Sequence, residues 1–238
     1  MRDNEPVNDA DQEQERGSRL HPRVTSFRSR RGALTATQQV CWDETWPVIG
    51  RDVDDAPLDA TAWFGRDAPL IIEIGSGTGT ATAAMAKAEP ENNLLAVEVY
   101  RPGIAQLLQQ IQREDITNIR LLRGDAVDVL ENMVAPESLT GVRVFFPDPW
   151  PKARHAKRRF VQQDTLDLVL ERLRPGGHLL VATDHASYAE HVREQLSQHP
   201  RVVVVEGERP AWRPSAGFED KGRAAGRAIH EFRVTEAG

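Results

Sequence analysis

Residues 69–79 read Pro69-Leu-Ile-Ile-Glu-Ile-Gly-Ser-Gly-Thr-Gly79, and this segment decides the fold. Its first six residues form a short, mostly apolar run that is typical of a buried β-strand. The glycines that follow let the backbone turn tightly and come close to a ligand. A helix is expected over residues 80–89, where Pro90 ends it. The segment therefore predicts a strand, a glycine loop and a helix in direct succession.

Strands and helices alternate outward from this unit. Short apolar strands are expected at residues 69–74, 94–98, 119–122, 142–146, 178–183, 201–205 and 229–234. Between the strands, apolar residues recur at helical spacing, as in Ile104, Leu107, Leu108 and Ile111. Such alternation with short connections predicts an α/β fold with a doubly wound, mostly parallel, seven-stranded sheet and helices on both of its faces.

The chain before residue 69 is expected to add little to the sheet. Residues 1–32 are polar, first acidic and then arginine-rich, and they are expected to form a disordered tail. Residues 33–238 are expected to form a single domain. Within it, a short helix is expected from Thr35 to Trp46, ended by Pro47. A loop with a helical turn near Trp63 should follow.

Composition excludes several classes of protein. The 238 residues suit one α/β domain with extensions, and no apolar run approaches the roughly 18–20 residues of a membrane span. The N-terminus has no apolar segment of the kind a signal peptide needs. A single cysteine, Cys41, excludes an internal disulfide and a cysteine-rich zinc site, and the histidines suggest no metal site. A cytoplasmic protein without a metal is expected.

Positive charge is concentrated in two blocks, although the net charge is −6. Residues 16–31 hold six arginines and no acid, and residues 152–159 hold five basic residues and His155. A charge run is often only a solvated face. Both blocks are nevertheless candidates for holding nucleic-acid phosphates, because phosphate contacts use concentrated basic side chains.

Acidic residues stand at or just after the carboxyl ends of five successive predicted strands. They are Glu73, Glu98, Asp125, Asp148 and Asp184. In open parallel sheets the ligand binds beyond the carboxyl ends of the strands. Packing alone does not readily explain one acid from each of five strands, so this edge is the predicted binding site.

The glycine loop has two main candidate ligands, a nicotinamide dinucleotide and S-adenosylmethionine. The dinucleotide fingerprint needs glycine at position 80, where this chain has Thr80. Glu73 would repel a pyrophosphate but suits the positive amino group of S-adenosylmethionine. Glu98 is placed to accept both ribose hydroxyls, and Asp125 to accept the adenine amino group, unless these acids are helix caps or surface residues. The set favours the methyl donor.

The most distinctive stretch follows the fourth predicted strand and reads Phe145-Phe-Pro-Asp-Pro-Trp-Pro-Lys152. The prolines on both sides of Asp148 fix its backbone and remove two N–H donors that would otherwise need partners. The basic block of residues 152–159 continues directly from this stretch. A positive ridge beside the predicted binding edge suits a nucleic-acid substrate.

These segments resemble the bacterial tRNA (guanine-N7-)-methyltransferase family. The likeness extends from about Arg28 to Val234 and is carried by residues 73–79, 146–152, 153–159, 182–184 and 217–219. It implies a Rossmann-like class I methyltransferase. It further implies methyl transfer from S-adenosylmethionine to N7 of a guanosine in the variable loop of tRNA.

The resemblance also implies roles for the matched positions. Donor binding falls to Glu73, Gly75, Gly77, Gly79, Glu98, Asp125 and Asp148. Substrate binding falls to Lys152, Asp184, Ala216, Gly217, Phe218 and Glu219, and RNA contact to Arg154, His155, Ala156, Lys157, Arg158 and Arg159. The family usually has a threonine and a basic residue where this chain has Ala216 and Gly217. Contacts at these two positions are therefore expected to use the backbone.

Asp148 is the expected catalytic residue. Guanine N7 already carries an in-plane lone pair, so no base is needed to create the nucleophile. Methylation leaves the purine positively charged, and a carboxylate that accepts from N1–H and the exocyclic amine would stabilise that charge. Asp184 and Glu219 are possible helpers.

Two other functions remain open from the sequence. One is a methyltransferase that acts on another nucleobase or on protein. The other is a non-catalytic RNA-binding protein with this fold, although such a protein would have no need of Glu73, Glu98 and Asp125 together.

Overall fold

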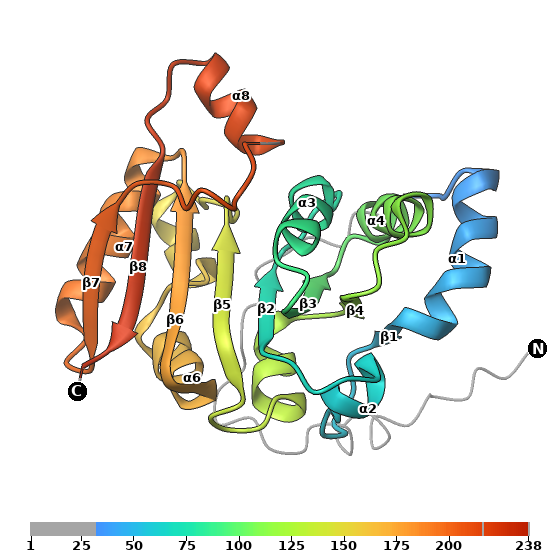
Figure 1. The fold of residues 1–238 in the computed structure, drawn as a ribbon. Coiled ribbons are helices and arrows are strands. Elements are labelled where there is room, and N and C mark those ends of the chain that lie inside the picture. The colour runs from blue at the N-terminus through green and yellow to red at the C-terminus, as the bar shows by residue number, and fades with distance from the viewer. Residues whose placement is uncertain (1–31, 216, 238) are drawn as a thin grey trace, which may run out of the picture.

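An eight-stranded sheet organises the chain in the computed structural model, which describes residues 32–215 and 217–237 (Figure 1). The side chain of Phe218 is outside this description. The strands are β1 Gly50–Asp52, β2 Leu70–Ile74, β3 Asn93–Glu98, β4 Ile119–Arg123, β5 Leu139–Phe145, β6 Leu173–Thr183, β7 Val202–Gly207 and β8 His230–Glu236. Their order is β1-β4-β3-β2-β5-β6-β8-β7. Pairing is parallel from β1 to β6, and β8 is antiparallel to both of its neighbours. The predicted fold class is confirmed.

Helices cover both faces of the sheet (Figure 1). One face packs against α1 Ala36–Ile49, α3 Thr80–Ala88 and α4 Arg101–Glu114. The opposite face packs against α2 Ala60–Phe64, α5 Ala126–Asp128 with the π-turn η2 Val129–Met133, α6 Gln163–Arg172 and α7 Ala186–Gln198. Each of the apolar α4 residues predicted from helical spacing is buried, from Ile104 to Ile111. Burial of this stripe is what fixes α4 to the sheet.

Two local predictions were wrong. The sheet has eight strands rather than seven, because Gly50–Asp52 pairs with β4 and Asp52 bonds Arg123 at 2.6 and 2.8 Å. A strand of three residues is too short to show a periodic pattern. Pro47 does not end α1, which continues to Ile49. A proline removes only one helical hydrogen bond, and the stacking of Trp42 on Trp46, with ring centroids 4.5 Å apart, holds the last turns.

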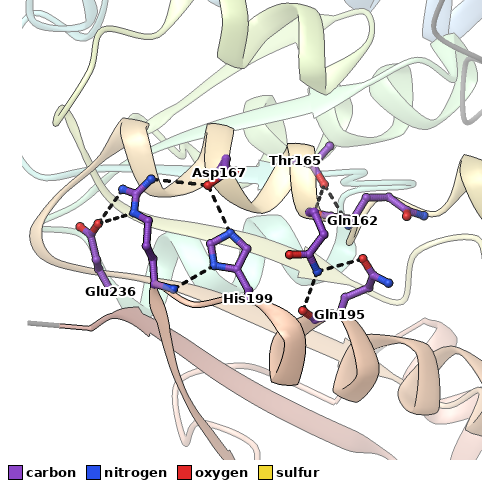
Figure 2. A network of polar contacts seen from close by, with 8 residues as sticks. Gln162, Thr165, Asp167, Gln195, His199 and Glu236 are labelled. Carbon is purple, nitrogen blue, oxygen red and sulfur yellow. Dashed lines mark hydrogen bonds and ion pairs between the residues drawn. The ribbon is translucent and has the colours of Figure 1, made fainter.

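A network of polar contacts joins α6 to α7, to the segment that follows α7 and to β8 (Figure 2). An Asp167 carboxylate oxygen lies 3.3 Å from His199 Nε2 and 3.5 Å from an Arg201 nitrogen. Arg201 also pairs with Glu236 at 2.6 Å. Nearby, Gln163 Nε2 donates to the Gln195 carbonyl oxygen at 2.8 Å, which ties α6 to α7.

The predictions for residues 1–31 lie outside the described residues. Within residues 32–215 and 217–237, no helix is both long and apolar enough to cross a membrane.

Candidate functional site

The carboxyl ends of β4, β3, β2, β5 and β6 lie side by side (Figure 1). The strand bounds place the five predicted acids at this edge. Glu73 and Glu98 are within β2 and β3, whereas Asp125, Asp148 and Asp184 follow β4, β5 and β6. The charge of Asp148 acts on Glu98, and the charge of Glu98 acts on Glu73. Glu73, Glu98 and Asp148 therefore lie close enough to interact electrostatically.

The glycine loop between β2 and α3 is built from left-handed backbone. Gly75, Gly77 and Gly79 have φ of 79°, 59° and 77°, which side-chain-bearing residues rarely adopt. A Cβ at Gly79 would lie 2.4 Å from Leu107, so this glycine serves packing against α4. A Cβ at Gly75 or Gly77 would meet nothing within 4 Å. The first two glycines therefore border open space, where a ligand can approach the backbone.

Gly103, in the first turn of α4, is a part of the site that sequence reasoning missed. A Cβ there would lie 2.2 Å from the Gly77 carbonyl oxygen. The absence of a side chain lets α4 pack directly against the glycine loop. The signal available in the sequence was a glycine inside a strongly amphipathic helix, where packing is a usual reason for it.

Glu98 holds the glycine loop through backbone donors. Its Oε2 accepts from Gly77 N at 2.7 Å, and its Oε1 accepts from Val99 N and Tyr100 N at 2.7 and 2.8 Å. Burial raises the pKa of Glu98, and these three N–H groups oppose that rise. Because a carboxylate has about four acceptor positions, about one remains for a ligand. Acceptance of both ribose hydroxyls stays a prediction.

Glu73 is a buried carboxyl group, and its Oε2 has no hydrogen-bond partner. Burial raises the pKa of Glu73 to about 7, although the Thr82 hydroxyl and then the nearby charge of Arg143 oppose that rise. The hydroxyl of Ser76 is also buried without a hydrogen-bond partner. A buried polar atom without a partner costs free energy, so this group of orphaned oxygens is suited to a polar ligand.

Asp125 is the N-cap of α5, where its side chain accepts from Val127 N at 2.9 Å. This is the helix-cap interpretation that the sequence had left open. The carboxylate has further acceptor positions, so the cap does not preclude contact with a ligand.

Asp148 projects from a constrained loop. Phe146 and Trp150 on either side of Pro147-Asp-Pro149 have φ of 52° and 40°. Phe146 N donates to the Ala182 carbonyl oxygen at 2.8 Å, which ties the loop to β6. Asp148 is exposed, and the described residues make no hydrogen bond or ion pair with its side chain. The carboxylate is therefore available to a ligand.

The basic block forms a short 3-10 helix, η3 Ala153–Arg158, beside the Asp148 loop. Lys152, Arg154 and Lys157 are exposed. Arg158 lies over the Trp150 ring at 4.9 Å, and the His155 ring meets the same tryptophan edge-on at 5.6 Å. Ala156 contributes its carbonyl oxygen, which accepts from Gln162 Nε2 at 2.8 Å. Arg159 turns inward, and its contacts are described below.

The C-terminal segment folds over the β6 end through arginine–carboxylate pairs. Glu219, in α8 Phe218–Ala224, is 0% exposed and bonds Arg213 Nη1 at 2.5 Å. Its other oxygen bonds Arg223 at 2.9 Å and lies 3.7 Å from Arg209. Asp184, which is partly exposed, pairs with a single arginine, Arg227, at 2.8 Å. Both acids are thus already neutralised by the chain itself.

Arg213 is a second part of the site that the sequence did not reveal. Its side chain is 2% exposed, bonds Glu219 and Glu231, and lies over the Phe145 ring at 4.9 Å. It therefore joins α8, β8 and the end of β5. Gly217, with φ of 62°, begins α8, whereas Ala216 and the Phe218 side chain lie outside the described residues.

In the part of the chain that the structure describes, no group of three or more His, Cys, Asp or Glu residues is arranged to hold a metal ion.

Comparisons with known proteins agree with this geometry. A family described as "Putative methyltransferase" matches residues 67–232. The tRNA (guanine-N(7)-)-methyltransferase of Rhodococcus jostii (strain RHA1) is 64% identical over 245 residues, covering 98% of this chain and 95% of the relative. The protein of the same name from Nocardia farcinica (strain IFM 10152) is 62% identical, covering 91% and 85%. The solved structure of an antibiotic-related methyltransferase shares the fold, with TM-score 0.51, 17% identity and coverage of 79% and 100%.

Proposed function

The chain belongs to the tRNA (guanine-N7-)-methyltransferase family, and on this premise we propose that it transfers a methyl group from S-adenosylmethionine to N7 of a guanosine in the variable loop of tRNA. The observation that carries the proposal is the position of Asp148. Its exposed carboxylate lies between the acids beside the glycine loop and the basic helix η3. Residues 33–238 are the proposed catalytic domain, and the cytoplasm is the proposed site of action.

The residues around the glycine loop fit the methyl donor. The unpartnered Oε2 of Glu73 is suited to a cationic amino group, and the open space at Gly75 and Gly77 admits a ligand against the backbone. Glu98 is proposed to accept from a ribose hydroxyl through its remaining acceptor position, and Asp125 is proposed to accept from the adenine amine. Gly79 supports the site indirectly, through packing on α4. When bound, the donor supplies a sulfonium methyl group, whose bond to sulfur breaks as its bond to N7 forms.

Asp148 is the proposed catalytic residue, and it also borders the donor site. We propose that its carboxylate accepts hydrogen bonds from N1–H and the exocyclic amine of guanine. The negative charge would then stabilise the positive charge that develops on the purine. No proton has to leave N7, so the chain needs to position the base and stabilise charge. The backbone constraint from Pro147 and Pro149 keeps the carboxylate in place for both tasks.

The tRNA is proposed to lie along η3 and the C-terminal segment. Lys152, Arg154 and Lys157 present exposed positive charge for phosphates. We place the target guanine beside Asp184, which follows β6, and beside residues 216–219. Arginines already pair with Asp184 and Glu219. We therefore propose that these two acids hold α8 in place and do not bind guanine directly.

Methyl transfer from labelled S-adenosylmethionine to unmodified tRNA transcripts tests the proposal. Reduction and aniline cleavage, which cut at 7-methylguanosine, map the product. A cut in the variable loop is expected, and a transcript with adenosine at that position should take no label. Label without a cut would move the reaction to another atom. Binding of tRNA without label would favour a non-catalytic RNA-binding protein.

A further inference from the structure

We propose that Arg159, the last residue of the basic block, is a positioning residue for Asp148 and does not bind a tRNA phosphate. The inference rests on the proposed function, which makes Asp148 the group that meets the guanine. It divides the predicted RNA-contacting residues into an outward set that binds tRNA and an inward set that holds the catalytic loop.

The first observation is the pair of hydrogen bonds made by the Arg159 guanidinium. Nε donates to the Pro149 carbonyl oxygen at 3.1 Å, and Nη2 donates to the Trp150 carbonyl oxygen at 3.3 Å. These carbonyls directly follow Asp148 and belong to no helix or strand. A planar guanidinium can bond both at once in a fixed geometry, as a lysine cannot. Arg159 therefore fixes the backbone on the C-terminal side of Asp148.

The second observation is the conformation of that backbone. Trp150 has φ of 40°, in the left-handed region that aromatic residues rarely occupy. Such a conformation persists only where the surroundings hold it. Phe146 N, bonded to Ala182, holds the N-terminal side of the loop, and Arg159 holds the C-terminal side. Loss of Arg159 would release one of the two attachments of Asp148.

The third observation is the contrast inside the block. Arg159 is half-buried at the end of η3, and its own N–H donates to the Ala156 carbonyl oxygen at 3.0 Å. Lys157, two residues earlier, is exposed and makes no ion pair with the described residues. The exposed ammonium group of Lys157 can bind a phosphate without losing another contact. The Arg159 guanidinium would have to break its hydrogen bonds to two carbonyl oxygens to do the same. The helix thus connects tRNA binding on one side to the Asp148 loop on the other.

The test compares Arg159→Gln and Arg159→Lys with Lys157→Gln as the matched control. Two quantities are measured for each variant, the single-turnover methylation rate at saturating tRNA and the dissociation constant for tRNA. We expect Arg159→Gln to lower the rate by about 10- to 100-fold, because small displacements of a catalytic group have effects of this size. Its affinity for tRNA should change by less than about twofold. Arg159→Lys, which can still bond one carbonyl, should recover part of the rate.

Lys157→Gln should show the opposite pattern, with weaker tRNA binding and a smaller change in rate at saturation. The inference is overturned if Arg159→Gln leaves the rate unchanged, or if it weakens tRNA binding as much as Lys157→Gln does. Donor affinity and the melting temperature of each variant show whether it is folded. A general structural defect in Arg159→Gln would lower both the donor affinity and the melting temperature. That outcome also counts against a positioning role.

Failure of the proposed function gives a different result. In that case the wild-type chain transfers no methyl group to tRNA in the same assay. The affinity comparison between the Arg159 and Lys157 variants then decides alone whether Arg159 is a phosphate contact.

Discussion

Two groups of acids in the candidate site differ in what surrounds their charge. Glu73, Glu98 and Asp148, near the glycine loop, make no ion pair with the described residues. Asp184 and Glu219, near the C-terminal segment, are each paired with arginine. Acids near a ligand site are therefore not equivalent, and their partners indicate whether they serve a ligand or the fold.

The difference has an energetic meaning. A buried carboxylate oxygen without a partner destabilises the folded state, and a cationic ligand at Oε2 of Glu73 would relieve that cost. A buried carboxylate between arginines is the reverse case, because removing it leaves buried positive charge uncompensated. The first group should therefore respond to mutation in activity, and the second in stability.

Glu219→Gln should give the largest effect. The substitution keeps the shape but leaves Arg213, which is 2% exposed, without one of its carboxylates. Loss of one partner of a buried ion pair typically costs about 3–5 kcal/mol of unfolding free energy. Urea unfolding followed by circular dichroism measures it. A loss below about 1 kcal/mol would mean that the arginine pairs do not hold α8, and the comparison would fail on this side.

Asp148→Asn should lower kcat by about 100- to 1000-fold, the range found when one electrostatic stabiliser of a transition state is removed. Because the side chain is exposed and unpaired among the described residues, the melting temperature should not change. Steady-state methylation and tRNA binding are the measurements. A loss of tRNA affinity as large as the loss of kcat would reassign Asp148 from catalysis to binding.

Glu73→Gln should weaken donor binding by about 10- to 100-fold, yet raise stability at pH 8. The raised pKa, about 7 against an ordinary 4.5, means that the folded chain keeps a proton that the unfolded chain releases. The stability from this proton is present below about pH 4.5 and is lost as the pH rises to about 7. Glutamine avoids that loss, so melting at pH 8 should occur at a higher temperature than in the wild type.

The same titration gives donor binding a pH dependence. A cationic donor favours ionised Glu73, so binding below about pH 7 must displace a proton. Affinity should then fall as the pH is lowered from 8 to 6, by at most tenfold per unit, with proton release visible by calorimetry in buffers of different ionisation enthalpy. An equal pH dependence in Glu73→Gln would show that another group is responsible.

The sequence predicted one side of this comparison far better than the other. Strand ends and glycine turns are local patterns, so the sequence alone suffices to place Glu73, Glu98 and Asp148 at one edge of the sheet. Arg213 contacts Glu219 in α8 and Glu231 in β8. These contacts join separate elements, and no local sequence pattern predicts them. The sequence also could not predict that Arg159 points inward, because nothing in a run of basic residues distinguishes an inward side chain from an outward one.

Asp167→Asn should give the smallest effect, and it tests whether pairing alone explains the stability of the second group. Asp167 also has cationic and imidazole neighbours, His199 and Arg201, but its side chain is 53% exposed (Figure 2). His199 Nδ1 accepts from Arg201 N at 3.3 Å, so the proton on Nε2 can point at Asp167 without any charge on the ring. Water competes for such a pair, and we expect the melting temperature to shift by less than about 4 °C, with kcat unaffected. If Asp167→Asn were as destabilising as Glu219→Gln, an arginine partner would suffice to stabilise the fold; a much smaller shift means that burial decides, and that Glu219 matters because water cannot replace its partners.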